Sequence, residues 1–113
     1  MLNIIKFAAK MALQNPKVKE GIKNAEVDSA CREVLKQAGM EEAFTHGTGH
    51  GVGLDIHESP AINGRSKEKL IPGMVVTIEP GIYFTDTCGV RWEDLYEITE
   101  TGARRLTLSA KSP

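Results

Sequence analysis

The spacing of apolar residues changes once along this chain, and that change limits the folds it can adopt. In the first dozen residues, and again from Val27 to Ala38, apolar side chains recur three and four positions apart, as on one face of an α-helix. From Met74 onward, runs of apolar residues alternate with polar ones, as in strands that bury one face. Helices followed by strands favour an α+β domain, in which two N-terminal helices pack on a largely antiparallel sheet.

Two helices are predicted in the first part of the chain. The first lies between Asn3, which can cap it, and Pro16, which cannot continue it. The second follows Asn24, and Gly39 stands where a left-handed residue commonly ends a helix. The apolar positions of this second helix are Val27, Ala30, Cys31, Val34, Leu35 and Ala38.

The second part of the chain predicts strands joined by turns. The segments MVVTIE and IYF read as two short strands across the Pro80-Gly81 turn. The segment GVRWEDLYEIT predicts one longer alternating strand, which returns as a hairpin through Thr101-Gly102. Trp92, Tyr96 and Ile98 alternate onto the face opposite Glu93 and are predicted core residues. The preceding stretch SPAINGRSKEKLIPG is rich in turn residues and predicts a polar loop.

Size and charge exclude several classes of partner. A chain of 113 residues predicts a single domain. Fourteen basic and fifteen acidic side chains give a net charge of −1, so no broad field attracts nucleic acid or an anionic membrane. The N-terminal apolar run is interrupted by lysine and is too short to span a bilayer. The two cysteines lie outside any metal-binding spacing, and we therefore expect a reducing, cytoplasmic location.

The stretch HGTGHGVGLDIHESP contains all three histidines and predicts a site. Its glycines do not complete a dinucleotide fingerprint. The zinc-protease helix motif is also excluded, because Ala61 stands where a second histidine is needed and Pro60 would break the helix. His46 and His50 would lie roughly 13 Å apart in an extended chain, so one ion could not bind both. We expect one histidine to ligate a metal and another to contact substrate.

Two carboxylates on the predicted strands are further candidates. Glu79 stands beside the Pro80-Gly81 turn, and Glu93 stands two residues from Arg91. A buried carboxylate is costly unless it is paired or bound to a cation. The open alternative is that Glu93 simply pairs with Arg91 and that Glu79 caps a turn.

Four motifs in order carry a resemblance to a known family: HGTGHGVGLDIHESP, PGMVVTIEPGIY, GVRWED and ITETGARRLT. Together they resemble the C-terminal catalytic half of the pita-bread metallopeptidases, and among these the Xaa-Pro dipeptidases (prolidases) and Xaa-Pro aminopeptidases. The segment NAEVDSACREVLKQAGM is similar to the helix that precedes the histidine motif in that family. The resemblance implies half of a pita-bread (creatinase/aminopeptidase-like) fold.

The resemblance also implies an activity, which is hydrolysis of the peptide bond before proline by a water that two metal ions activate. It implies these metal ligands, with the last bridging the two ions: His50, Glu79 and Glu93. It implies these residues at or beside the substrate: His46, His57 and Arg91. Manganese, cobalt or zinc would suit such ligands. The stretch VRWED and the short link from Tyr83 to Arg91 favour the dipeptidases, with a proline-containing dipeptide or peptide as substrate.

This chain departs from the family pattern at two aspartate metal ligands. In the family, these aspartates lie eleven residues apart in the N-terminal half of the catalytic domain. No pair among Asp28, Asp55, Asp86 and Asp94 has that spacing. We therefore expect residues 1–113 to be the C-terminal portion of a catalytic domain whose N-terminal half is absent. Such a chain would bind at most one ion weakly and would have negligible peptidase activity by itself.

One further expectation follows from a missing half, and the fold leaves one alternative function open. The absence of this half would expose apolar sheet surface, which favours a homo-oligomer or pairing with a complementing N-terminal half. A noncatalytic protein- or RNA-binding module on the same fold is the alternative function.

Overall fold

Both predicted helices are present in the computed structural model, which describes residues 1–14 and 21–111. Helix α1 spans Leu2–Gln14, and α2 spans Asn24–Gln37. Pro16, the predicted stop of the first helix, lies outside the described residues. The end of α2 is as predicted: Gly39 has φ +71°, its N–H donates to the Lys36 carbonyl, and the Met40 N–H donates to that of Leu35. These are the two bonds of a Schellman motif.

The strands form two sheets, and every neighbouring pair is antiparallel. A five-stranded sheet has the order β2-β1-β3-β6-β7. Its strands are β1 Gly49–Gly51, β2 Glu58–Ile62, β3 Val75–Ile78, β6 Asp94–Thr99 and β7 Gly102–Arg105. A separate hairpin pairs β4, Gly81–Phe84, with β5, Cys88–Arg91. A short 3-10 helix, η2, spans Glu41–Ala43 between α2 and β1.

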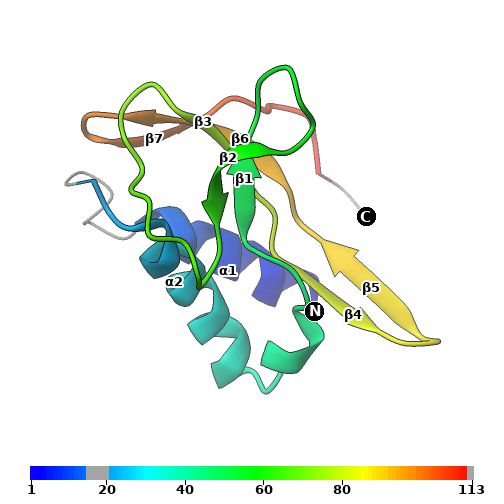
Figure 1. Ribbon diagram of the computed structural model, residues 1–113. Helices are drawn as coiled ribbons and strands as arrows, with labels where there is room; N and C mark the ends of the chain where they lie inside the picture. Colours follow the sequence, from blue (N-terminus) through cyan, green and yellow to red (C-terminus); the bar gives the residue numbers. More distant parts are fainter. Residues whose placement is uncertain (15–20, 112–113) are drawn as a thin grey trace.

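The helices cover one face of the five-stranded sheet, while β4 and β5 extend away from it (Figure 1). The core between the layers is apolar and fully buried, and it includes Ile5, Ala8, Val27, Leu35, Ile62, Val76, Ile78 and Ile98. Trp92 and Tyr96 pack against this core from partly buried positions. The α+β prediction is confirmed. Of the predicted core residues, Ile98 is buried, whereas Trp92 and Tyr96 are only partly buried. No helix in the described ranges is long and apolar enough to cross a membrane.

The predicted polar loop at residues 59–73 is wrong in its first part, because β2 occupies Glu58–Ile62. Pro60 and Ile62 are buried while Ser59 and Ala61 are exposed, so this segment alternates as a strand does. β1 supplies the pairing, with His50 opposite Ala61. Turn-forming residues in the segment obscure a strand that only its long-range partner stabilises.

The predicted long strand GVRWEDLYEIT is also wrong, because it is two strands in different sheets. β5 pairs with β4 and ends at Arg91, whereas β6 pairs with β3 and begins at Asp94. The chain thus changes partner at Trp92 and Glu93 while its alternation continues. The hairpin return through Gly102 is confirmed, since β7 pairs with β6.

Candidate functional site

The strand that carries His50 is packed so closely between its neighbours that its flanking residues must be glycine. A Cβ atom at Gly49 would lie 1.8 Å from the Thr77 carbonyl oxygen. One at Gly51 would lie 2.1 Å from the Ser59 carbonyl oxygen. His50 is therefore the one side chain of β1, held between β2 and β3 in the middle of the histidine stretch.

His50 and Glu79 face each other directly. His50 Nε2 lies 3.0 Å from Glu79 Oε1. The other ring nitrogen, Nδ1, lies 2.9 Å from the Gly51 carbonyl oxygen, which can only accept, so Nδ1 carries the donating proton. The Thr77 hydroxyl supports this arrangement, because it accepts from the His50 N–H and donates to Glu79 Oε1 at 2.8 Å.

This geometry places two acceptors against each other. With Nδ1 protonated, Nε2 of a neutral imidazole has only a lone pair, and a carboxylate oxygen likewise only accepts. Such a contact is repulsive unless a proton or a cation lies between the two atoms. A separation of 3.0 Å between the two donor atoms also fits two ligands at right angles, each about 2.1 Å from one ion. The pair therefore fits a metal site.

The backbone register brings Glu93 opposite Glu79. Ile78 pairs with Asp94 at the start of β6, and Gly81 pairs with Arg91 at the end of β5. Residues 92 and 93 form the break between these two strands. The Trp92 N–H donates to the Pro80 carbonyl at 3.0 Å, so the pairing continues across the break. Directly opposed residues of an antiparallel pair project to the same side, and carboxylates in that position repel each other unless a cation intervenes.

Arg91 supplies positive charge beside these carboxylates. Arg91 Nε lies 3.5 Å from Glu93 Oε2, and both side chains are about half exposed. The pKa of Arg91 is raised, first by a hydrogen bond with the Tyr83 hydroxyl and further by the charges of Glu93 and Glu79. The Arg91 and Glu93 pairing that the sequence left open is thus present. Within residues 1–14 and 21–111, no group of three or more His, Cys, Asp or Glu side chains is arranged to hold a metal. The role of Glu93 as a ligand stays a prediction.

The other two histidines contact different groups. The His57 ring lies edge-on to the His50 ring, with centroids 4.4 Å apart. His46 lies in the segment before β1, and its Nε2 is 2.7 Å from the Tyr83 hydroxyl. Because a hydrogen bond with Tyr83 raises the pKa of Arg91, two of the predicted substrate residues, His46 and Arg91, are linked through a tyrosine that the sequence did not predict as a site residue.

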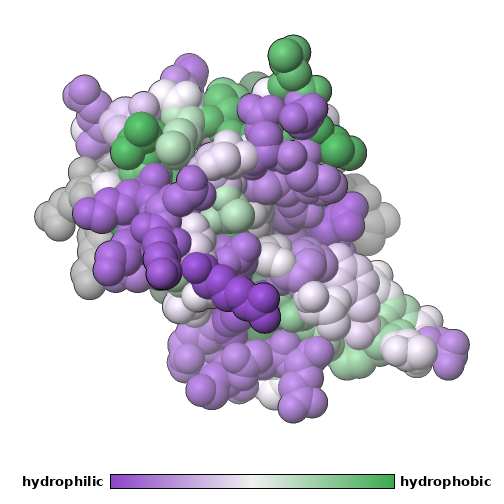
Figure 2. All heavy atoms as spheres, viewed as in Figure 1, coloured by the Kyte–Doolittle hydropathy of each residue, from purple (hydrophilic) through white to green (hydrophobic). Residues whose placement is uncertain are grey.

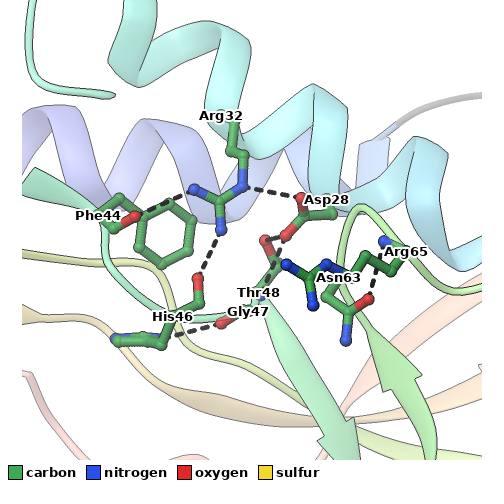
Figure 3. A network of polar contacts seen from close by, with 8 residues as sticks. All are labelled: Asp28, Arg32, Phe44, His46, Gly47, Thr48, Asn63 and Arg65. Carbon is green, nitrogen blue, oxygen red and sulfur yellow. Dashed lines mark hydrogen bonds and ion pairs between the residues drawn. The ribbon is translucent and has the colours of Figure 1, made fainter. Parts of the chain in front are cut away.

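An ion pair on α2 with a buried carboxylate, also missed from the sequence, supports the segment that carries His46 (Figure 3). Asp28 is 1% exposed. Its Oδ2 accepts from Arg32 Nε at 2.8 Å, and its Oδ1 accepts from the Thr48 N–H and hydroxyl. Spacing of four residues on a helix signals such a pair. It does not signal that the pair is buried.

Arg32 also donates hydrogen bonds to the backbone of the same segment. Its Nη1 donates to the Phe44 carbonyl at 3.0 Å, and its Nη2 donates to the His46 carbonyl at 2.6 Å. The Thr48 carbonyl in turn accepts from the Glu79 N–H at 2.7 Å. Helix α2 is therefore connected by hydrogen bonds to both the His46 segment and the Glu79 backbone.

Comparison with known proteins gives consistent relatives. Residues 2–100 match metallopeptidase family M24. The Xaa-Pro dipeptidase of Pyrococcus furiosus is 52% identical over 89 residues, which are 79% of this chain and 26% of that protein. The solved dipeptidase of Pyrococcus horikoshii superposes with a TM-score of 0.90 at 46% identity, over 96% of this chain and 30% of that one. The X-Pro aminopeptidase of Thermotoga maritima has a TM-score of 0.90 at 37% identity, over 97% of this chain and 31% of that one.

The chain thus spans between a quarter and a third of the length of these relatives. Their likeness confirms the family resemblance drawn from the four motifs and the half pita-bread fold that it implied.

Proposed function

Because the chain belongs to metallopeptidase family M24, we propose that it serves the metal-dependent hydrolysis of Xaa-Pro peptide bonds. The observation that carries this proposal is the 3.0 Å contact between His50 Nε2 and Glu79 Oε1. Both atoms are acceptors, and a cation bound between them would remove their repulsion. Relatives named as Xaa-Pro dipeptidases support the choice of bond. The proposed substrate is a proline-containing dipeptide or peptide.

The proposed metal ligands are His50, Glu79 and Glu93. An imidazole with carboxylates suits manganese, cobalt or zinc. A bound divalent ion would lower the pKa of a water and polarise the scissile carbonyl. The protein's own part is to hold these ligands: the Gly51 carbonyl fixes the His50 tautomer, and the Thr77 hydroxyl orients the Glu79 carboxylate.

The remaining site residues are proposed to bind and orient the substrate. His57, in contact with the His50 ring, is placed to donate to the substrate next to the metal ligands. His46 accepts from Tyr83 through Nε2, and Tyr83 bonds to Arg91. The guanidinium of Arg91 would offset negative charge near Glu93 as the carbonyl is attacked.

We further propose that the 113-residue polypeptide, assayed by itself, binds at most one ion weakly and hydrolyses Xaa-Pro dipeptides negligibly. His50, Glu79 and Glu93 can complete one ion's coordination only in part, and charge on the reacting water would be poorly offset without a second ion. Incubation with Gly-Pro and manganese tests this. Measurable turnover that depends on Glu79 would contradict the proposal of an inactive chain.

Calorimetric titration with manganese or zinc tests the metal site itself. We expect the wild-type chain to bind about one ion. We expect His50→Ala and Glu79→Gln to lower the metal affinity by more than the roughly tenfold loss that follows from changing a residue outside the ligand set. Glu33→Gln is the matched control, because Glu33 lies on the exposed side of α2 and bonds to Gln37. Equal affinity in all four proteins would overturn the proposed site.

One observation favours a second candidate, a noncatalytic protein- or RNA-binding module. The described part of the chain has no ready cluster of three metal-binding side chains. Wild-type protein that binds no divalent ion in the titration would support this module over the enzyme.

A further inference from the structure

Residues 92–94 join the two sheets and contain a buried carboxylate. Trp92 and Glu93 lie between β5 and β6, and Asp94 is the first residue of β6. Asp94 is 1% exposed. A carboxylate buried to this degree is costly unless it is hydrogen-bonded and paired with a positive charge. The partners of Asp94 therefore show what holds this junction.

Two of the three side chains that bind Asp94 come from residues 106–111, beyond β7. Its Oδ1 accepts from the Thr107 hydroxyl at 2.5 Å and lies 3.0 Å from Lys111 Nζ. Its Oδ2 accepts from the Trp92 indole N–H at 3.1 Å. The Leu95 backbone secures the segment through its carbonyl, which accepts from the Leu106 N–H, and through its N–H, which donates to Thr107.

A single ammonium group contacts all three residues of the junction. Besides Asp94, Lys111 Nζ donates to the Glu93 carbonyl. It also lies 4.8 Å from the centre of the Trp92 ring, within range of a cation–π interaction. The Lys111 side chain is 24% exposed, so water screens these contacts only partly.

We propose that Asp94, Thr107 and Lys111 form a latch that positions Glu93 opposite Glu79. The pairing of β6 with β3 and of β5 with β4 requires the chain to change sheets at a defined point within residues 92–94. The latch contacts all three of these residues from residues 106–111. The three residues of the latch are positioning residues, because they contact the Glu93 backbone and the residues on either side of Glu93, not its carboxylate. The consequence for metal binding rests on the function proposed above, whereas the latch itself does not.

Trp92 is the only tryptophan of the chain, so its spectra report on the latch without metal or substrate. Lys111→Met keeps the apolar stem of the side chain and removes the ammonium. We expect it to increase the quenching of Trp92 fluorescence by acrylamide and to shift the NMR signals of the Trp92 indole N–H and the Glu93 amide. Lys111→Arg, which retains the charge, should restore both toward wild type. Lys67→Met is the control, because Lys67 is an exposed lysine in the segment between β2 and β3.

Metal affinity is the readout that a purely stabilising contact would not change. Lys111→Met should weaken manganese or zinc binding roughly tenfold, as outer-shell changes typically do, while the circular dichroism spectrum stays native. Thr107→Val should act in the same direction through the Asp94 carboxylate. Unchanged Trp92 and Glu93 signals in Lys111→Met would overturn the latch. The latch would also be overturned if these signals shift in Lys111→Met while its metal affinity stays equal to that of the wild type. If the wild-type chain binds no ion, the proposed metal site fails, while the Trp92 and Glu93 signals still decide the latch.

Discussion

At the scale of single residues, the glycines beside His50 serve backbone packing. A Cβ atom at Gly49 would meet the Thr77 carbonyl group, with its oxygen at 1.8 Å and its carbon at 2.8 Å. Both obstacles are backbone atoms of β3 and cannot rotate away. Glycine permits such close approach of backbone to backbone, and the strand that presents His50 depends on it.

We predict that Gly49→Ala destabilises the fold by about 2–3 kcal/mol, because β1 or β3 must shift to admit the methyl group. Urea unfolding followed by circular dichroism measures this change. Gly64→Ala is the control, since its Cβ would meet only the Asp28 carboxylate at an ordinary 3.7 Å. Equal stability of the two variants would contradict the close approach of β1 and β3.

The two cysteines should differ in reactivity. Burial raises the pKa of the Cys31 thiol from 9.0 to about 12, and this effect outweighs the hydrogen bond with Thr48 that lowers it. Cys88 is exposed. We predict that iodoacetamide at mildly alkaline pH labels Cys88 in the native chain and labels Cys31 only after unfolding, as mass spectrometry would show. Labelling of Cys31 at the rate of Cys88 would contradict its burial.

The same shift in pKa makes stability depend on pH. Because the folded pKa of Cys31 lies above the unfolded one, its contribution is fully present below pH 9.0 and is lost as pH rises toward about 12. Cys31→Val should reduce the alkaline loss of unfolding free energy, measured in urea across this range.

At the scale of elements, the site depends on contacts between α2 and the segment that leads into β1. Arg32 joins the buried Asp28 to the carbonyls of Phe44 and His46. Its guanidinium also lies 4.3 Å from the centre of the Phe44 ring. The helix therefore fixes the path of the chain that presents His46, although His46 itself lies outside α2.

We predict that Arg32→Met costs about 3–5 kcal/mol, because it leaves the Asp28 carboxylate buried without a positive partner. Adding Asp28→Asn to this variant should recover part of the loss, since a neutral amide is cheaper to bury. Arg104→Met removes an exposed pair with Glu97 and should cost less than about 1 kcal/mol. Chemical denaturation of the four proteins tests the order, and a similar cost for Arg32→Met and Arg104→Met would contradict it.

At the scale of the whole molecule, apolar side chains remain on the surface away from the core. Leu54 and Ile56, in the loop between β1 and β2, are 105% and 79% exposed. In Figure 2 the visible face is largely hydrophilic, and hydrophobic atoms gather over this loop. This exposed apolar loop supports the proposal that the chain pairs with a second copy or with another polypeptide.

We predict that light scattering gives an average mass above the 12.3 kDa of one chain, rising with concentration. The double variant with Leu54→Ser and Ile56→Ser should lower this mass, because it removes the exposed apolar tip. Phe7→Ser, which changes a half-exposed residue of α1, is the control. A constant monomer mass at every concentration would contradict self-association. Co-purification with another chain that carries an aspartate pair eleven residues apart would support complementation instead.

Local spacing was sufficient for the properties that depend on near neighbours in sequence. The helical period and Gly39 predicted α2 and where it ends, and the alternation after Met74 predicted strands. The order of four motifs was sufficient for the family. Each of these signals lies within a short stretch of chain, where propensity, period and turn chemistry act directly.

Only the tertiary structure decided which backbone segments pair. It made a strand of Glu58–Ile62, broke the predicted long strand at Trp92 and Glu93, and buried Asp28 beneath the His46 segment. A backbone group exchanges hydrogen bonds with whichever partner the fold brings to it, and that partner lies far away in sequence. The amino-acid sequence therefore determined the kinds of elements and the family, whereas long-range pairing decided where the elements end and which side chains face one another.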